Sequence, residues 1–107
     1  MGKNVINVLP SVIDYLNELI IRLYENEYFG FLESAETYVS NIYDSIPELV
    51  EKQKHKQTPA ELQKHGKFYI SYSSNKRTNW YIFFNRRENR FLIKYITNNH
   101  MPDAKFL

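Results

Sequence analysis

The spacing of the apolar side chains changes once along this 107-residue chain, and that change limits the folds it can adopt. Up to about residue 53 the apolar residues recur every three or four positions, which predicts amphipathic helices. From residue 67 onward apolar and polar side chains alternate, which predicts β-strands. Helices followed by a run of strands are typical of an α+β fold, and residues 1–107 are expected to form a single domain.

The first half predicts one short strand and two helices. Residues 3–9 are rich in β-branched side chains and predict an opening strand. We expect the first helix to be capped by Ser11, with Asp14 adding an acid to its first turn. A second apolar stripe runs from residue 31 to residue 46. Pro47 lacks a donor and clashes with the preceding turn, so we expect a break or kink there and a short extension to about residue 53.

The second half predicts a short helix and a meander of three strands. Residues 54–57 are polar and are expected to form a linker, and residues 58–61 match a capping box that would start a helix ended by Gly66. Strands are predicted around residues 67–73, 80–84 and 91–97, with polar hairpin loops at 74–78 and 85–89. The middle strand is apolar on both faces, as expected of a central strand. The helices are expected to cover one face of an antiparallel sheet, with the opening strand beside the meander.

Charge divides at the same place as the apolar spacing. Residues 1–53 carry three cations and nine acids, whereas residues 54–107 carry eleven cations and three acids. The basic half is also the aromatic, strand-forming half. A basic surface rich in aromatic side chains is suited to an anion, and nucleic acid is the first anion to consider.

Composition argues against several other classes of protein. There is no cysteine, which leaves no disulfide framework or thiolate metal site and fits a reducing cytoplasm. No stretch reaches the ~20 apolar residues of a membrane span, and the N-terminus does not read as a secretory signal. His55, His65 and His100 lack metal-ligand spacing, so we expect no metal and no cofactor. The expected location is the cytoplasm.

Three blocks of sequence carry a resemblance to a known superfamily. These blocks are TPAELQKHGKFYISYSS, TNWYIFFN and RFLIKYITNNH. With the order of opening strand, helical hairpin and basic meander ending at a histidine, the chain resembles the RelE/ParE superfamily of toxins from bacterial type II toxin–antitoxin modules. It is similar to members found as toxins or plasmid-stabilisation proteins. The resemblance covers nearly the whole chain.

The resemblance implies two activities. RelE-like members are metal-independent endonucleases that cut messenger RNA on the ribosome, and ParE-like members inhibit DNA gyrase without catalytic groups. Both kinds are held inactive by a cognate antitoxin. We expect a toxin that acts as a ribosome-dependent mRNA endonuclease. Gyrase inhibition and a non-toxic basic module that binds RNA or protein are the alternatives.

Three residues are candidates for the chemistry of RNA cleavage, which needs a base, an acid and cations near the phosphate. His100 follows the last strand and has a suitable ordinary pKa; the alternative is that it only bonds the turn. Lys94 interrupts an apolar strand and would face a phosphate; the alternative is a solvated edge lysine. Tyr69 would stack on a base; the alternative is that it covers part of the core.

A second group of residues is expected to bind RNA or its phosphates. Clustered cations bind a phosphate backbone without regard to sequence. The candidates are Lys67, Lys76, Arg77, Tyr81, Arg86, Arg87 and Arg90. The arginine loops would otherwise only solubilise the chain or dock acidic side chains of an antitoxin. RelE-like nucleases usually carry an arginine within the strand that corresponds to residues 80–84, and none is present here, which weakens the catalytic hypothesis.

Overall fold

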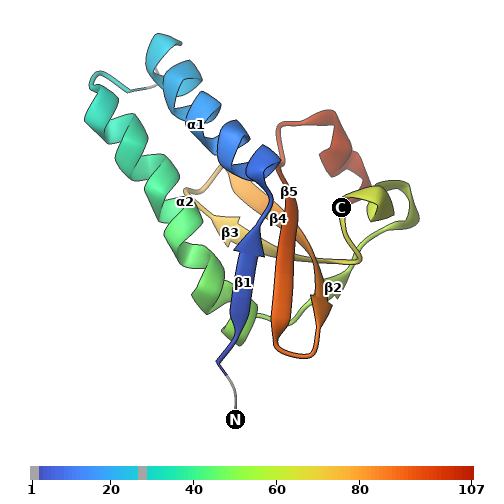
Figure 1. Ribbon diagram of the computed structural model, residues 1–107. Helices are drawn as coiled ribbons and strands as arrows, with labels where there is room; N and C mark the ends of the chain where they lie inside the picture. The colour runs from blue at the N-terminus through green and yellow to red at the C-terminus, as the bar shows by residue number, and fades with distance from the viewer. Residues whose placement is uncertain (1–2, 27–28) are drawn as a thin grey trace.

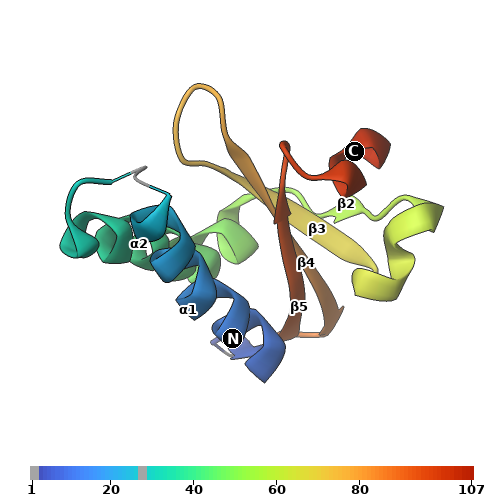
Figure 2. The same cartoon turned by 90° about the horizontal axis from the view of Figure 1, so that it is seen from above.

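A computed structural model of the chain describes residues 3–26 and 29–107. Two α-helices lie on one face of a five-stranded sheet, and two 3₁₀ helices lie toward the other (Figures 1 and 2). The elements in chain order are β1 (Val5–Val8), α1 (Pro10–Glu25), α2 (Leu32–Lys52), β2 (Lys56–Gln57), η1 (Ala60–His65), β3 (Phe68–Ser73), β4 (Asn79–Arg87), β5 (Arg90–Asn98) and η2 (Pro102–Phe106). The predicted α+β class is confirmed. No helix in the described ranges is both long and apolar enough to cross a membrane.

The sheet has the strand order β1-β5-β4-β3-β2 and is mixed rather than antiparallel. Strands β2 to β5 form antiparallel pairs, but β1 runs parallel to β5, with Val5 opposite Arg90 and Val8 opposite Ile93. A parallel pair needs a long crossover between its strands, and here the crossover contains both α-helices and the meander. The opening strand therefore lies beside the meander, as predicted, but in the same direction as its last strand.

The main core lies between the sheet and the two α-helices. Leu16 of α1 and Ile42 and Ile46 of α2 belong to the same buried cluster as Ile82 and Phe84 of β4. Phe83, between those two β4 residues, is also fully buried, but on the opposite face of the sheet. The prediction that this central strand is apolar and buried on both sides is confirmed.

The start of α1 differs from the prediction. The helix begins at Pro10, and its N-cap residue is Leu9, which makes no side-chain capping bond. Ser11 is therefore not the cap, and Asp14 lies beyond the first turn. Proline suits the first position because its fixed φ is already helical and that position needs no intrahelical donor.

Helix α2 runs from Leu32 to Lys52 without a break, so the predicted interruption at Pro47 is wrong. Pro47 lies on the exposed side of the helix, whereas Ile46 and Val50 on either side of it are buried. The apolar stripe keeps its helical phase through the proline. Burial of that stripe against the sheet outweighs the one backbone hydrogen bond that the proline removes.

Three local features of the second half also differ from the prediction. The expected linker contains β2, which pairs with Phe68 and Tyr69 of β3. Helix η1 has Pro59 as its N-cap, without a bond from Thr58, although it ends at Gly66 as predicted. The predicted loop at residues 85–89 is a tight turn, so that Arg86 and Arg87 lie within β4.

Candidate nucleic-acid interface

The face of the sheet opposite α1 and α2 carries a row of aromatic side chains. Tyr69 of β3 lies opposite Phe83 of β4, which lies opposite Tyr95 of β5. The ring centroids are 5.5 Å apart in the first pair and 5.9 Å apart in the second. Tyr81 joins this row through an edge contact with Tyr69, with centroids 6.1 Å apart. Tyr69 and Tyr81 are half-buried, so each covers part of the sheet and still presents a ring surface to solvent.

Helix η1 places a histidine over this aromatic row. The His65 ring stacks on Tyr95 with a centroid separation of 3.7 Å and an interplanar angle of 9°. It also lies 6.1 Å from the Phe83 ring, which accounts for the burial of Phe83 on a face that no α-helix covers. Gly66, the next residue, allows this close approach, because a Cβ there would lie 2.8 Å from the Phe84 nitrogen.

The C-terminal helix η2 supplies an acid to the same cluster. The Tyr95 hydroxyl donates a hydrogen bond to the Asp103 carboxylate at 2.7 Å. Burial, followed by this hydrogen bond, raises the pKa of Tyr95 to about 12. Tyr95 therefore keeps its proton across the physiological range and acts as a fixed platform beneath His65.

Burial of His65, assisted by nearby cations, favours its neutral form. Burial lowers the pKa of His65, the Lys64 and Lys94 ammonium groups lower it further, and the Asp103 carboxylate opposes them. Lys94 occupies a β-bulge: Tyr95 pairs with Phe83 and Ile93 with Phe84, which leaves Lys94 without an opposite residue in β4. A neutral imidazole near an ammonium group can accept a proton close to a bound anion.

His100 lies elsewhere, at one end of the sheet. Its Nε2 atom lies 3.2 Å from Thr78 Oγ1, and its backbone N–H donates to Asn98 Oδ1 at 2.8 Å. Asn98 lies four strand positions beyond Lys94, a span of about 13 Å. The structure thus places His100 with the exposed Lys76 and Arg77 of the 74–78 loop rather than with Lys94.

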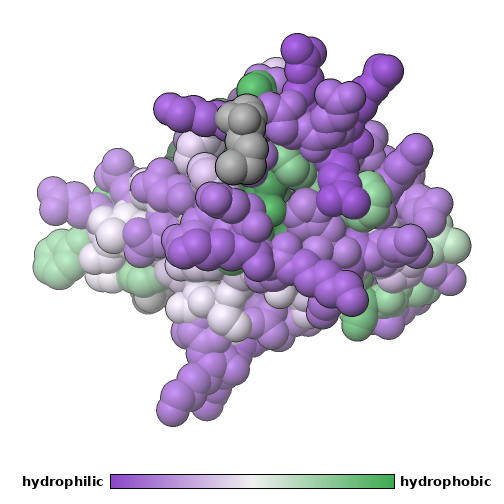
Figure 3. Space-filling view, turned by 90° about the horizontal axis from the view of Figure 1, so that it is seen from below, coloured by the Kyte–Doolittle hydropathy of each residue, from purple (hydrophilic) through white to green (hydrophobic). Residues whose placement is uncertain are grey.

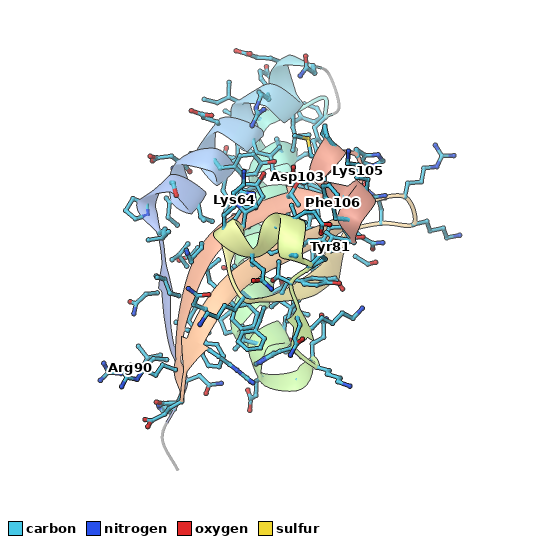
Figure 4. All side chains as sticks on the ribbon, turned by 90° about the vertical axis from the view of Figure 1, so that its right-hand side faces the viewer. Lys64, Tyr81, Arg90, Asp103, Lys105 and Phe106 are labelled. Carbon is cyan, nitrogen blue, oxygen red and sulfur yellow. The ribbon has the colours of Figure 1, made fainter. Side chains whose placement is uncertain are left out.

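The arginines of the β4–β5 hairpin lie at the other end of the sheet. Arg87 and Arg90 are directly opposite each other across the β4–β5 turn and are exposed. They line a cavity of about 310 Å³, whose walls comprise Asn7, Asn85, Arg86, Arg87, Arg90, Phe91 and Leu92. Lys67 is exposed nearby, and its backbone N–H donates to Asn85 Oδ1 at 2.8 Å. Figure 4 shows Arg90 far from Lys64, Tyr81 and Asp103.

Arg86 is the one predicted phosphate ligand that the structure engages elsewhere. Its guanidinium carbon lies 4.6 Å from the Phe68 ring centroid, and its Nη1 donates to His55 Nδ1 at 2.8 Å. Because His55 Nδ1 accepts, its Nε2 carries the hydrogen and donates to the Val50 carbonyl oxygen at 2.8 Å. Arg86 thus ties β4 to the end of α2.

The interface therefore consists of an aromatic centre with cations at both ends. The candidates Tyr69, Tyr81 and Lys94 belong to the centre, and the loop cations that are candidates for phosphate binding lie at the ends. His65 is the residue that sequence reasoning missed, since it considered this histidine only as a metal ligand. No local pattern identifies it, because its stacking partner comes from a strand 30 positions further along the chain.

Within residues 3–26 and 29–107, no group of three or more His, Asp or Glu side chains is arranged to hold a metal ion. Comparison with known proteins adds no assignment of its own: no family model, no curated protein and no solved structure matches this chain. The function is therefore inferred from the residues and their geometry.

Proposed function

We propose that this protein is the toxin of a toxin–antitoxin module and that it cleaves messenger RNA on the open face of its sheet. The observation that carries the proposal is the stacking of His65 on Tyr95, next to Lys94, in an aromatic surface with cations at both ends. Burial and nearby cations, Lys94 among them, lower the pKa of His65. Aromatic rings stack bases of any sequence, and the flanking cations hold the phosphate backbone.

The proposed reaction uses groups on this face together with solvent water. His65 accepts the proton of an RNA 2′-hydroxyl, and the freed oxygen attacks the adjacent phosphorus. The bond from phosphorus to the 5′-oxygen breaks, and that oxygen takes a proton from water. The Lys94 ammonium offsets the negative charge that builds on the phosphate. Tyr69 and Tyr81 stack the neighbouring bases, and the cations at either end extend the path of the strand.

The order of the elements supports the RelE/ParE proposal. An opening strand, a helical hairpin and a meander followed by a histidine correspond here to β1, α1–α2, β3–β5 and His100. In this proposal the ribosome presents the messenger RNA, the protein acts in the cytoplasm, and a cognate antitoxin blocks the basic surface. His100, together with Lys76 and Arg77, is assigned to backbone phosphates rather than to proton transfer, because it lies beside the 74–78 loop.

Growth on induced expression tests the proposal. We expect the wild-type chain to arrest growth and to cut ribosome-bound mRNA, and we expect His65→Gln and Lys94→Met to abolish both effects. Lys52→Met is the matched control, because Lys52 is exposed on α2 and bonds only Glu48. If the His65 and Lys94 variants fold and remain as toxic as the control, the assigned nuclease site is wrong.

One observation favours the gyrase alternative. The central part of β4, residues 80–84, carries no arginine, and the side chain of Arg86 is held by Phe68 and His55. Purified protein that inhibits DNA supercoiling while leaving ribosome-bound mRNA intact would assign the toxin to gyrase. Harmless expression with salt-sensitive RNA binding would instead identify a non-toxic binding module.

A further inference from the structure

The two sides of the sheet differ in how far the backbone groups of their outer strands are hydrogen-bonded. At the β3 edge, the two residues of β2 pair with Phe68 and Tyr69. The Gln53 side chain then continues the ladder: Ser71 N–H donates to Gln53 Oε1 at 2.7 Å, and Gln53 Nε2 donates to the Ser71 carbonyl at 2.9 Å. The Gln53 side-chain amide thus occupies the hydrogen-bonding positions that a neighbouring strand would fill at Ser71. The strand left at this edge, β2, is only two residues long, which offers little backbone for further pairing.

The β1 edge is open. Val5 N–H donates to the Asn89 carbonyl at 2.8 Å, and Leu9 N–H donates to the Ile93 carbonyl at 3.0 Å, so the odd-numbered residues face β5. The backbone groups of Ile6 and Val8 therefore point away from the sheet. Among residues 3–26 and 29–107 no strand pairs with this side of β1. The segment VINV also lacks the charges and prolines that usually blunt an edge.

An apolar cavity lies beside this open edge. It has a volume of about 180 Å³ and is lined by Ile6, Val8, Tyr43, Asp44, Ile46 and Pro47. Because strand side chains alternate between faces, a strand added next to β1 would turn every second side chain toward this cavity. Figure 3, from below, shows a mainly hydrophilic surface interrupted by apolar patches.

This cavity adjoins another that lies between the two α-helices. A second cavity, of about 230 Å³, is lined mainly by α1 and α2 residues and shares Tyr43 and Asp44 with the first. The two helices carry eight carboxylates and two cations, and Asp44 stands in the wall that both cavities share. An occupant of this surface must therefore combine apolar side chains with positive charge.

We propose that the open edge of β1 accepts an extended, basic segment of a partner protein as a sixth strand. Its backbone would bond the outward groups of Ile6 and Val8, its alternate apolar side chains would enter the cavity, and a lysine or arginine would meet Asp44. This inference goes beyond the proposed function and does not depend on it. The partner would occupy the sheet edge and the adjoining cavities, leaving Lys94 and His65 free.

Amide hydrogen exchange with a defined probe tests the proposal. The probe is a capped hexapeptide of alternating valine and lysine, added to the full-length ¹⁵N-labelled chain. We expect the Ile6 and Val8 amides to exchange about tenfold or more slowly with the peptide bound. The amides of Val5 and Leu9, which already bond β5, serve as internal references.

Reversing the charge of Asp44 tests whether it selects a basic partner. Asp44→Lys is expected to weaken binding of the valine–lysine peptide roughly tenfold and to strengthen binding of a valine–glutamate peptide. Glu18→Lys is the matched control, since it makes the same charge change on an exposed α1 position outside both cavities. His65→Gln should bind the peptide normally, which separates this surface from the proposed nuclease site.

Three outcomes would overturn the proposal. The first is unchanged exchange at Ile6 and Val8 with saturating peptide. The second is equal binding of a peptide whose alternate backbone nitrogens are methylated, which would show that no strand forms. The third is protection that rises with protein concentration in the absence of peptide, which would assign the edge to a second copy of this chain.

Discussion

His65 combines two properties on one 3₁₀ turn. Its ring is stacked at 3.7 Å on Tyr95, and its charged form is disfavoured by burial and by Lys64 and Lys94. Tyr95 in turn is fixed by its bond to Asp103. Each group constrains the next, so the imidazole is oriented without a hydrogen-bonded carboxylate of its own.

Titration of His65 tests the environment assigned to its imidazole. Its pKa should lie below the ordinary value of about 6.5, rise in Lys94→Met and fall further in Asp103→Asn. Because the unfolded chain binds the proton more readily, His65 contributes stability above pH ~6.5 that is lost as the pH falls toward its folded pKa. NMR titration of the imidazole measures all three values. A wild-type pKa at or above the ordinary value would contradict the assigned environment.

Gly66 shows how one short element positions the candidate site. Helix η1 ends at this glycine, whose φ of 144° lies in a region that other residues rarely adopt. The backbone there approaches Phe84 so closely that there is no room for a side chain. The turn sets the exit of η1 against β4 and thereby sets the height of His65 above Tyr95.

Gly66→Ala should therefore destabilise the fold and disturb the site together. We expect a loss of about 2 kcal/mol or more in the free energy of unfolding, from backbone strain and the contact with Phe84. Urea denaturation measures the loss. Gly30→Ala is the control, because no atom lies within 4 Å of a Cβ built there. Equal stability of the two variants would contradict this account.

The sequence predicted the type and order of most elements and the antiparallel meander, but not the parallel direction of β1 or the pairing of β2 with β3. The helical and alternating spacings located α1, α2 and the meander, because these patterns follow directly from which side faces the core. The prediction of a break at Pro47 was wrong because burial of the apolar stripe around it outweighed the low helix propensity of proline. The bulge at Lys94 and the stack of His65 on Tyr95 depend on contacts between distant segments, which no local pattern records.

The whole molecule separates its charge in space as well as along the chain. The acids of α1 and α2 lie on the helical side, and the cations of the meander lie at the two ends of the other face. A polyanion would therefore meet attraction along the sheet and repulsion across the helices. For the approach of a polyanion, this uneven distribution of charge matters more than the small net charge of +2.

The salt dependence of RNA binding tests this separation. For single-stranded RNA, the double variant Arg87→Gln/Arg90→Gln should reduce the slope of log K against log salt concentration by about 1.4, because each phosphate contact contributes about 0.7. Lys52→Gln on α2 should leave the slope unchanged. The slope is measured by fluorescence anisotropy with a labelled oligonucleotide. An equal effect of both changes would show that RNA does not follow the proposed face.

The parallel pairing of β1 with β5 also governs when the fold can be completed. Within residues 3–26 and 29–107, β1 pairs with β5 alone, so the sheet stays unfinished until residues 90–93 have emerged from the ribosome. Contacts between the two ends of a chain form slowly, because a large loop must close before they are made. A nascent chain can thus assemble its helical hairpin early, but it completes its sheet only after residues 90–93 have been made.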